Sequence, residues 1–122
     1  MITILIIDDE IKLRETISEL LSYAGYEVIE AADGKEGLVK VKEFKPDLIL
    51  CDLMMPILDG YGFMGEHQIS DYSHIPVVFL TAKMDLTDKE IGYALGVKTY
   101  FEKPFVFKEL KKVIEYYLLP RD

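Results

Sequence analysis

The stretch Ile4-Leu5-Ile6-Ile7-Asp8-Asp9-Glu10 places four consecutive aliphatic residues directly before three acidic ones. Consecutive apolar residues, with no polar residue alternating between them, are typical of a strand that is buried on both faces of a parallel sheet. The acids after Ile7 mark the carboxyl end of that strand. This stretch therefore predicts a buried parallel strand whose end carries carboxylates.

Strand-length apolar runs alternate with helical stretches along the rest of the chain. The expected strands cover Ile2–Ile7, Tyr26–Glu30, Asp47–Cys51, Val77–Leu80 and Val97–Phe101. Helical spacing predicts helices that end before Gly25 and before Pro46, a helix after Asp59-Gly60, and helices over Leu86–Leu95 and Phe107–Leu119. This alternation predicts an α/β fold, a (βα)5 doubly wound five-stranded parallel sheet with helices on both faces. Since no linker or low-complexity segment interrupts it, we expect residues 1–122 to form a single domain.

Composition and charge exclude several classes of protein. The 122 residues include 14 Lys+Arg and 22 Asp+Glu, a formal net charge of −8, which does not attract nucleic acid or an anionic membrane. The apolar runs fall far short of the roughly 20 residues that span a bilayer. Acids from Asp8 onward leave no room for a signal peptide, and one cysteine cannot form an internal disulfide. We expect a cytoplasmic protein that makes no direct contact with nucleic acid or membrane.

The chemistry of the predicted fold should lie beyond the carboxyl ends of its strands, where doubly wound sheets bind ligands. Two unit charges of like sign 4 Å apart repel by about 1 kcal/mol in water and about 4 kcal/mol at an effective dielectric of 20, so carboxylates gathered there require a cation. Lys103 supplies one positive charge, and an all-oxygen ligand set suits Mg²⁺, or Mn²⁺, better than zinc. The residues expected at the strand ends are Asp8, Asp9, Glu10, Asp52, Thr81, Ala82, Lys103 and Pro104.

In order and spacing, these motifs resemble the response-regulator receiver domains (CheY-like) of two-component and phosphorelay signalling. The resemblance covers essentially the whole chain and implies the flavodoxin-like strand order 2-1-3-4-5. The residues that carry it are Asp8-Asp9-Glu10, Asp52-Leu53-Met54-Met55-Pro56 with Asp59-Gly60, Thr81-Ala82, and Tyr100-Phe101-Glu102-Lys103-Pro104-Phe105.

The resemblance implies a phosphorylation-dependent signalling switch rather than an enzyme. Asp52 would accept a phosphoryl group from a sensor histidine kinase or a histidine phosphotransfer protein. Asp8, acting through a metal-bound water, would hold Mg²⁺ together with Asp9, Asp52 and the backbone carbonyl of Met54. The resemblance also implies that Thr81 and Lys103 contact the phosphoryl oxygens and that the Lys103–Pro104 peptide bond is cis.

The implied readout is a change of surface. Thr81 would move toward the phosphoryl group, and Tyr100 would turn from an exposed to a buried position. The output surface would consist of the helix over Leu86–Leu95, the strand over Val97–Phe101 and the helix over Phe107–Leu119. This surface would contact a downstream protein target or effector domain. The resemblance also implies that two copies of the chain can form a homodimer through it.

Two variable positions bear on how long the phosphoryl group persists. Met54 lies two residues after Asp52, and Lys83 lies two residues after Thr81. In receivers these positions flank the path of the hydrolytic water. Because neither side chain offers a carboxylate or amide to orient that water, we expect slow self-dephosphorylation, with Lys83 able to pair with the phosphoryl group.

Other interpretations of these residues stay open at this stage. The chain could be a receiver-like interaction module that acts without phosphorylation, a flavin- or nucleotide-binding domain, or a phosphatase with an aspartyl-phosphate intermediate. The last two fit less well, because acids follow the first strand where a phosphate-binding loop would be Gly-rich, and position 54 carries no second acid. Asp8 or Asp9 could merely cap a helix. His67 and His74 are expected at the surface, and Cys51 is expected to be a buried, inert thiol.

Overall fold

The protein, described here from a computed structural model, forms a five-stranded parallel sheet with helices on both faces. The structure describes residues 1–82 and 86–118, apart from the side chains of Leu86 and Thr87. The strands follow the order β2-β1-β3-β4-β5, which confirms the predicted fold class and strand order. The elements are β1 (Thr3–Ile7), α1 (Ile11–Tyr23), β2 (Glu27–Ala31), α2 (Gly34–Phe44), β3 (Leu48–Asp52), α3 (Gly60–His67), β4 (Val77–Thr81), α4 (Leu86–Ala94), β5 (Thr99–Glu102) and α5 (Phe107–Leu118).

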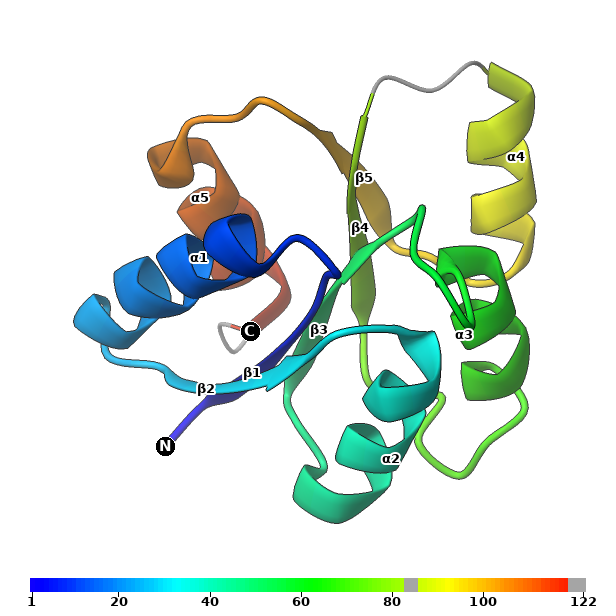
Figure 1. The fold of residues 1–122 in the computed structure, drawn as a ribbon, viewed down its shortest axis with the longest axis horizontal. Helices are drawn as coiled ribbons and strands as arrows, with labels where there is room; N and C mark the ends of the chain where they lie inside the picture. The colour runs from blue at the N-terminus through cyan, green and yellow to red at the C-terminus, as the bar shows by residue number, and fades with distance from the viewer. Residues whose placement is uncertain (83–85, 119–122) are drawn as a thin grey trace.

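The helices divide between the two faces of the sheet. In Figure 1, α1 and α5 cover one face, and α2, α3 and α4 cover the other. Each strand runs parallel to its neighbour, with Ile7 of β1 opposite Cys51 of β3 and Cys51 opposite Phe79 of β4. All strands therefore end at the same edge of the sheet, where the residues that follow them can meet.

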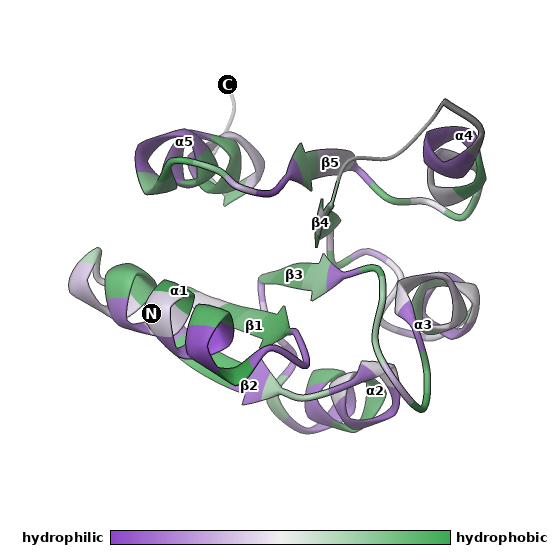
Figure 2. Cartoon of the chain, turned by 45° about the horizontal axis from the view of Figure 1, so that its top comes forward, coloured by the Kyte–Doolittle hydropathy of each residue, from purple (hydrophilic) through white to green (hydrophobic). Residues whose placement is uncertain are grey.

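Burial on both faces explains the unbroken apolar runs. In β1, Leu5 and Ile7 belong to the core on the α2–α3–α4 side, whereas Ile4 and Ile6 belong to the core on the α1–α5 side. Figure 2 shows β1 and β3 as hydrophobic ribbon at the centre of the molecule. Each fully buried Ile or Leu contributes roughly 1.5–3 kcal/mol of hydrophobic free energy. A polar alternation in these strands would place polar groups in one of the two cores.

The observed strand limits differ from the predicted ones by one or two residues. The third strand includes Asp52, and the fifth begins at Thr99 rather than at Val97. Val97 is nevertheless buried, and its neighbour Lys98 donates its backbone N–H to Val77 at 2.9 Å. The apolar side chain of Val97 thus correctly indicated a buried position. The limits of a strand, however, depend on which backbone groups form hydrogen bonds with the neighbouring strand.

The prediction of a surface position for His67 is wrong, although His74 is exposed as expected. His67 is only 1% exposed and stacks on Phe63 with a ring separation of 5.4 Å. These two residues are four apart in α3, so they share the helix face that packs on the sheet. The Nε2 atom of His67 lies 3.0 Å from the carbonyl oxygen of Ile75. Nδ1 is buried and has no hydrogen-bond partner among the described residues.

Acidification is expected to destabilise the protein through His67. Burial lowers the pKa of His67 below its ordinary value of 6.5. The unfolded chain therefore binds the proton first as the pH falls below 6.5, and stability is lost by up to about 1.4 kcal/mol per pH unit. His67→Gln keeps a donor for the Ile75 carbonyl and does not titrate. Urea unfolding at pH 7.0, 6.0 and 5.5 should show the wild type losing stability relative to His67→Gln, and parallel curves would contradict the expectation.

Candidate functional site

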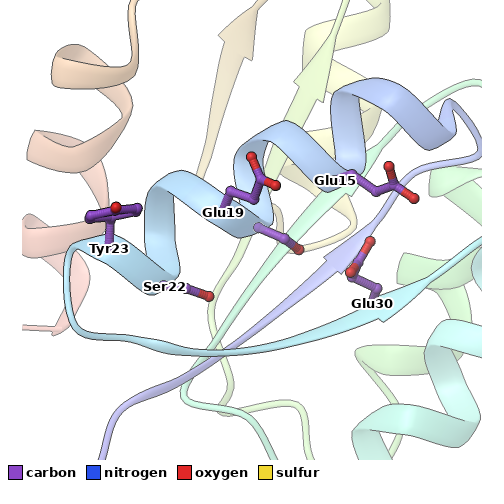
Figure 3. A pocket seen from close by; sticks show the side chains of 6 residues that line it. Glu15, Glu19, Ser22, Tyr23 and Glu30 are labelled. Carbon is purple, nitrogen blue, oxygen red and sulfur yellow. The ribbon is translucent and has the colours of Figure 1, made fainter.

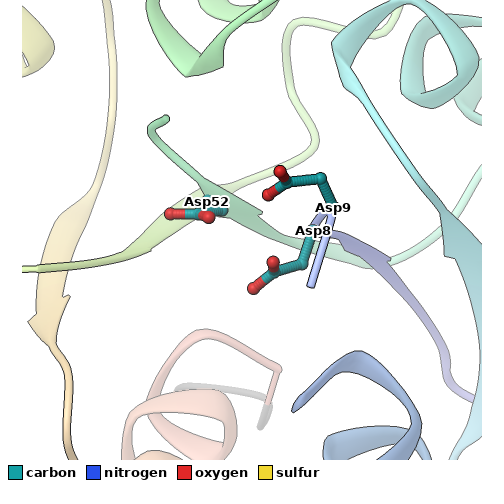
Figure 4. A group of neighbouring side chains, drawn as sticks. All are labelled: Asp8, Asp9 and Asp52. Atoms are coloured by element: carbon teal, nitrogen blue, oxygen red, sulfur yellow. The ribbon is translucent and has the colours of Figure 1, made fainter. Parts of the chain in front are cut away.

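Three carboxylates meet at the carboxyl ends of β1 and β3. Because β1 and β3 are adjacent, Asp8 and Asp9 lie beside Asp52, and one carboxylate oxygen from each falls within 4.8 Å of the others. Figure 4 shows the three side chains beside one another at the ends of these two strands. Asp8 is 1% exposed and Asp52 is 8% exposed, whereas Asp9 lies at the surface. The group is thus a pocket that opens to solvent on the side of Asp9.

Lys103 brings a positive charge into the same pocket from the end of β5. Its Nζ atom lies 3.0 Å from Oδ2 of Asp8 and 3.5 Å from Oδ2 of Asp52. The backbone N–H of Lys103 donates to the carbonyl of Thr81 at 2.7 Å, which joins the ends of β4 and β5, and Thr81 itself is buried. The Lys103–Pro104 peptide bond is cis. The ends of β1, β3 and β5 therefore contribute side chains to one pocket, and the end of β4 holds Lys103 by a backbone hydrogen bond.

The pocket contains more negative than positive groups, and this imbalance shifts the pKa values of its residues. Burial and the charge of Asp8 together raise the pKa of Asp52 to about 6. Lys103 and a 2.8 Å hydrogen bond from the N–H of Leu53 act in the opposite direction and limit the rise. For Lys103, burial lowers the pKa, but the hydrogen bond to Asp8 and the charges of Asp8 and Asp52 outweigh burial and raise it. One ammonium faces three carboxylates, so an added cation would be attracted.

The alternative in which Asp8 or Asp9 caps the first helix is not what the structure shows. Glu10 is the N-cap of α1 and makes no capping bond with its side chain, while Oδ1 of Asp8 accepts a hydrogen bond from the backbone N–H of Glu10 at 2.9 Å. Asp59, in contrast, caps α3 by accepting from the N–H of Gly62 at 2.8 Å. The acids at the end of β1 are thus directed to the pocket instead of to the helix.

Other residues singled out in the sequence have plain structural settings. Cys51 is buried, its Sγ lies 3.2 Å from the carbonyl oxygen of Asp52, and burial raises the pKa of its thiol well above its ordinary value, as expected of an inert thiol. Met54 is 72% exposed, whereas Met55 packs against the core. Lys83 lies outside the described residues. Tyr100 is half-buried, and its hydroxyl donates to backbone carbonyls of α4.

Sequence reasoning missed Arg14, which supports the pocket from α1. Its Nη1 donates to the carbonyl of Asp8 at 2.7 Å, and its Nε donates to Glu30 at 2.9 Å. Arg14 therefore ties the end of β1 to β2 behind the carboxylates. Periodicity and spacing give no signal for this role, because Asp8 and Glu30 come from other elements than α1.

A surface hollow elsewhere on the molecule shares no residue with the carboxylate pocket. It measures about 570 Å³ and lies between α1 and β2 (Figure 3). Among the described residues, no lysine or arginine lines it, so a phosphate group has no positive charge to bind there. Its lining residues are Glu15, Ser18, Glu19, Ser22, Tyr23 and Glu30.

The fold and the site together define a class: a flavodoxin-like α/β protein with a carboxylate pocket and a lysine at the carboxyl ends of its parallel strands. The chain belongs to the response regulator receiver domain family, whose family model, "Response regulator receiver domain", matches residues 4–115. It is a receiver domain of two-component signalling.

Relatives and solved structures agree with this assignment. The chain is 46% identical over 108 residues to "Probable transcriptional regulator ycf27" of Porphyridium aerugineum and 45% identical over 108 residues to that of Cyanophora paradoxa. Each match covers 88% of this chain and 44% of the relative, so the chain spans less than half the length of these proteins.

Among solved structures, the chemotaxis protein CheY4 of Vibrio cholerae is 35% identical, with a TM-score of 0.91 over 97% of this chain and 99% of that chain. The receiver domain of the Francisella response regulator 1452 is 29% identical, with a TM-score of 0.89 over 96% of each chain. Within the part of the chain that the structure describes, no helix is long and apolar enough to cross a membrane.

Proposed function

We propose that this chain is a phosphorylation-dependent switch in which Asp52 accepts a phosphoryl group with the help of Mg²⁺. The observation that carries the proposal is the carboxylate of Asp52, which is nearly buried between two further aspartates and lies 3.5 Å from the Lys103 ammonium. A carboxylate held in that setting can act as a nucleophile while neighbouring positive charge stabilises the transferring group.

The residues of the pocket fit a magnesium ion. Their donor set is all oxygen, three carboxylate oxygens lie within 4.8 Å of one another, and the pocket has fewer positive than negative groups. Asp8, Asp9, Asp52 and the backbone carbonyl of Met54 would hold the ion, with Mn²⁺ as an alternative. When bound, the ion would neutralise negative charge on the phosphoryl oxygens.

The transfer itself uses the side chains of this chain. A carboxylate oxygen of Asp52 forms a bond to phosphorus, the P–N bond of the donor phosphohistidine breaks, and its electron pair stays on the imidazole. Oδ1 of Asp52 accepts the N–H of Leu53, whereas Oδ2 faces Lys103, so the backbone orients the carboxylate. Lys103 and the hydroxyl of Thr81 would contact the phosphoryl oxygens.

A phosphodonor protein has a surface to approach beside the pocket. A hollow of about 400 Å³ is lined by Glu10 and Leu13 from the start of α1 and by Lys103, Pro104 and Phe105 after β5. Membership of the receiver family implies histidine kinases as partners. A sensor histidine kinase or a histidine phosphotransfer protein would place its phosphohistidine here, next to Asp52, in the cytoplasm.

Output would leave through α4, β5 and α5 to a downstream target or effector domain, with Thr81 and Tyr100 as the switch pair. Because the ycf27 relatives are named transcriptional regulators and are longer than this chain, an effector domain that controls transcription is the output we favour, with dimerisation through the same face. The exposure of Met54 next to the pocket, without a carboxylate or amide, supports a slowly hydrolysed phosphoryl group, and Lys83 lies outside the described residues.

Intact-mass measurement tests the proposed function. Incubation with acetyl phosphate and Mg²⁺ is expected to add one phosphoryl group to the wild type and none to Asp52→Asn, because the neutral amide is not a nucleophile. Asp71→Asn, which removes an exposed carboxylate elsewhere, should be phosphorylated like the wild type. No gain of mass under conditions that phosphorylate another receiver would favour the interaction module that acts without phosphorylation.

A further inference from the structure

Two tyrosine hydroxyls from different elements converge on one backbone carbonyl of α4. Tyr61 of α3 donates to the carbonyl oxygen of Asp88 at 3.1 Å, and Tyr100 of β5 donates to the same oxygen at 3.2 Å. The Tyr100 hydroxyl also reaches the carbonyl oxygen of Lys89 at 3.1 Å. The first turns of α4 are therefore connected to α3 and to β5 at the same point.

A glycine makes room for this arrangement. Gly92 lies one turn after Asp88, and a Cβ atom at this position would overlap the hydroxyl oxygen of Tyr100 and lie 2.6 Å from its Cζ atom. No L-residue with a side chain fits there while Tyr100 stays in place. Glycine in a helix interior costs about 1 kcal/mol relative to alanine, so Gly92 is unfavourable for α4 considered alone.

Aromatic rings complete the surroundings of Tyr100. Its ring packs edge-on against Phe79 of β4 at 5.5 Å and against Tyr93 of α4 at 5.1 Å. The ring of Tyr61 also packs edge-on against Phe79, at 6.3 Å. Burial, together with the neighbouring Tyr61 and Tyr93, raises the pKa of Tyr100 to about 12. The hydroxyl is thus enclosed by α4 rather than by solvent.

We propose that Gly92 and Tyr61 are positioning residues for the switch: Gly92 forms the slot that admits the Tyr100 hydroxyl to α4, and Tyr61 holds that part of α4 in the place where the slot exists. The inward position of Tyr100 and the position of α4 then form a single coupled unit. Tyr100 cannot enter when α4 is displaced, and α4 loses two of its hydrogen bonds to β5 when Tyr100 leaves. The link of this unit to phosphorylation rests on the proposed function.

A change of sign in thermal stability tests the slot. Gly92→Ala is expected to lower Tm by about 5 °C or more, because the new methyl group displaces the Tyr100 ring. In a Tyr100→Ala background, the same change should raise Tm by about 2–4 °C, since only the gain in helix propensity remains. Gly65→Ala is the matched control: this α3 glycine has open space at its Cβ, so Tm should rise in both backgrounds. If Gly92→Ala changes Tm equally in both backgrounds, the slot is refuted.

Hydrogen exchange tests the role of Tyr61 without disturbing Gly92. Tyr61→Phe removes only the hydroxyl, so amides of residues 88–94 are expected to exchange about three- to ten-fold faster, with those of α5 unchanged. Unchanged exchange in residues 88–94 would refute the role of Tyr61. This measurement needs no phosphorylation and keeps the proposal testable if Gly92→Ala folds poorly.

The link to phosphorylation is tested by the fraction of protein phosphorylated at a subsaturating concentration of acetyl phosphate. If the inward Tyr100 and the phosphoryl group favour each other, Gly92→Ala should lower this fraction several-fold, and Gly65→Ala should not. Equal fractions in both variants would refute the link. A wild type that takes up no phosphoryl group would instead overturn the proposed function, and the Tm and exchange results would still decide the roles of Gly92 and Tyr61.

Discussion

Replacing Lys103 by methionine is expected to slow phosphorylation of Asp52 by acetyl phosphate about 10²–10³-fold, the usual effect of removing one group that stabilises charge in a transition state. The Nζ atom of Lys103 lies 3.0 Å from Asp8 and 3.5 Å from Asp52, and its raised pKa keeps it charged at neutral pH. Methionine retains much of the aliphatic stem and removes the charge. The initial rate of mass gain at several acetyl phosphate concentrations measures the effect.

Two controls accompany this substitution. Lys108→Met removes an exposed lysine at the start of α5 and should leave the rate unchanged. In Lys103→Met, the carboxylate of Asp8, which is 1% exposed, loses the ammonium that neutralises it, and this destabilises the fold. Thermal melts in Mg²⁺ are therefore needed to establish that the variant is folded. A folded Lys103→Met protein that is phosphorylated at the wild-type rate would remove Lys103 from the proposed chemistry.

Replacing Asp52 by asparagine is expected to stabilise the metal-free protein at pH 7 by roughly 1–3 kcal/mol. Burial, together with Asp8, raises the pKa of Asp52 from 3.8 to about 6, so the folded state disfavours the charged form. Stability contributed by the protonated carboxyl is fully present below about pH 4 and is lost as the pH rises through 6. Asparagine does not titrate, so the difference between the two proteins should grow from pH 4 to pH 7.

Urea unfolding in EDTA at several pH values measures this difference. Mg²⁺ should stabilise the wild type and reduce the advantage of Asp52→Asn, because an ion that binds the folded state shifts the unfolding equilibrium. Asp71→Asn, at an exposed position, should change little at any pH. If Asp52→Asn is less stable than the wild type in EDTA at pH 7, burial and the charge of Asp8 do not make the ionised Asp52 carboxylate destabilising.

Much of the fold could be predicted because its signals are local. The apolar run of β1 is buried on both faces, as consecutive aliphatic residues indicated, and the alternation of strands and helices led to the observed doubly wound sheet. The gathering of Asp8, Asp52 and Lys103 also followed, since parallel strands in one sheet end at one edge. Order along the chain was enough to predict which residues would share the pocket.

The error at His67 and the open alternative for Asp8 both concern residues whose neighbours come from other elements. His67 is a polar residue in a short glycine-containing helix, yet the Ile75 carbonyl and the ring of Phe63 make its buried position acceptable. Asp8 resembles a helix cap by its place in the chain, but the hydrogen bond from Glu10 and the ion pair with Lys103 direct it to the pocket. Asp8 and Lys103 are 95 residues apart in the chain, so no local stretch of sequence contains both partners of this ion pair.

By itself, the sequence determined the class of fold, the edge of the sheet at which the chemistry lies and the residue types available there, because periodicity and strand order are properties of the chain. Only the tertiary structure decided the charge balance of the pocket and the place of Tyr100. The pKa of Asp52 depends on burial and on charges from β1 and β5, and Gly92 becomes a slot only because the Tyr100 ring from another element points into it. These effects act through space over a few ångströms, between residues that the chain holds far apart.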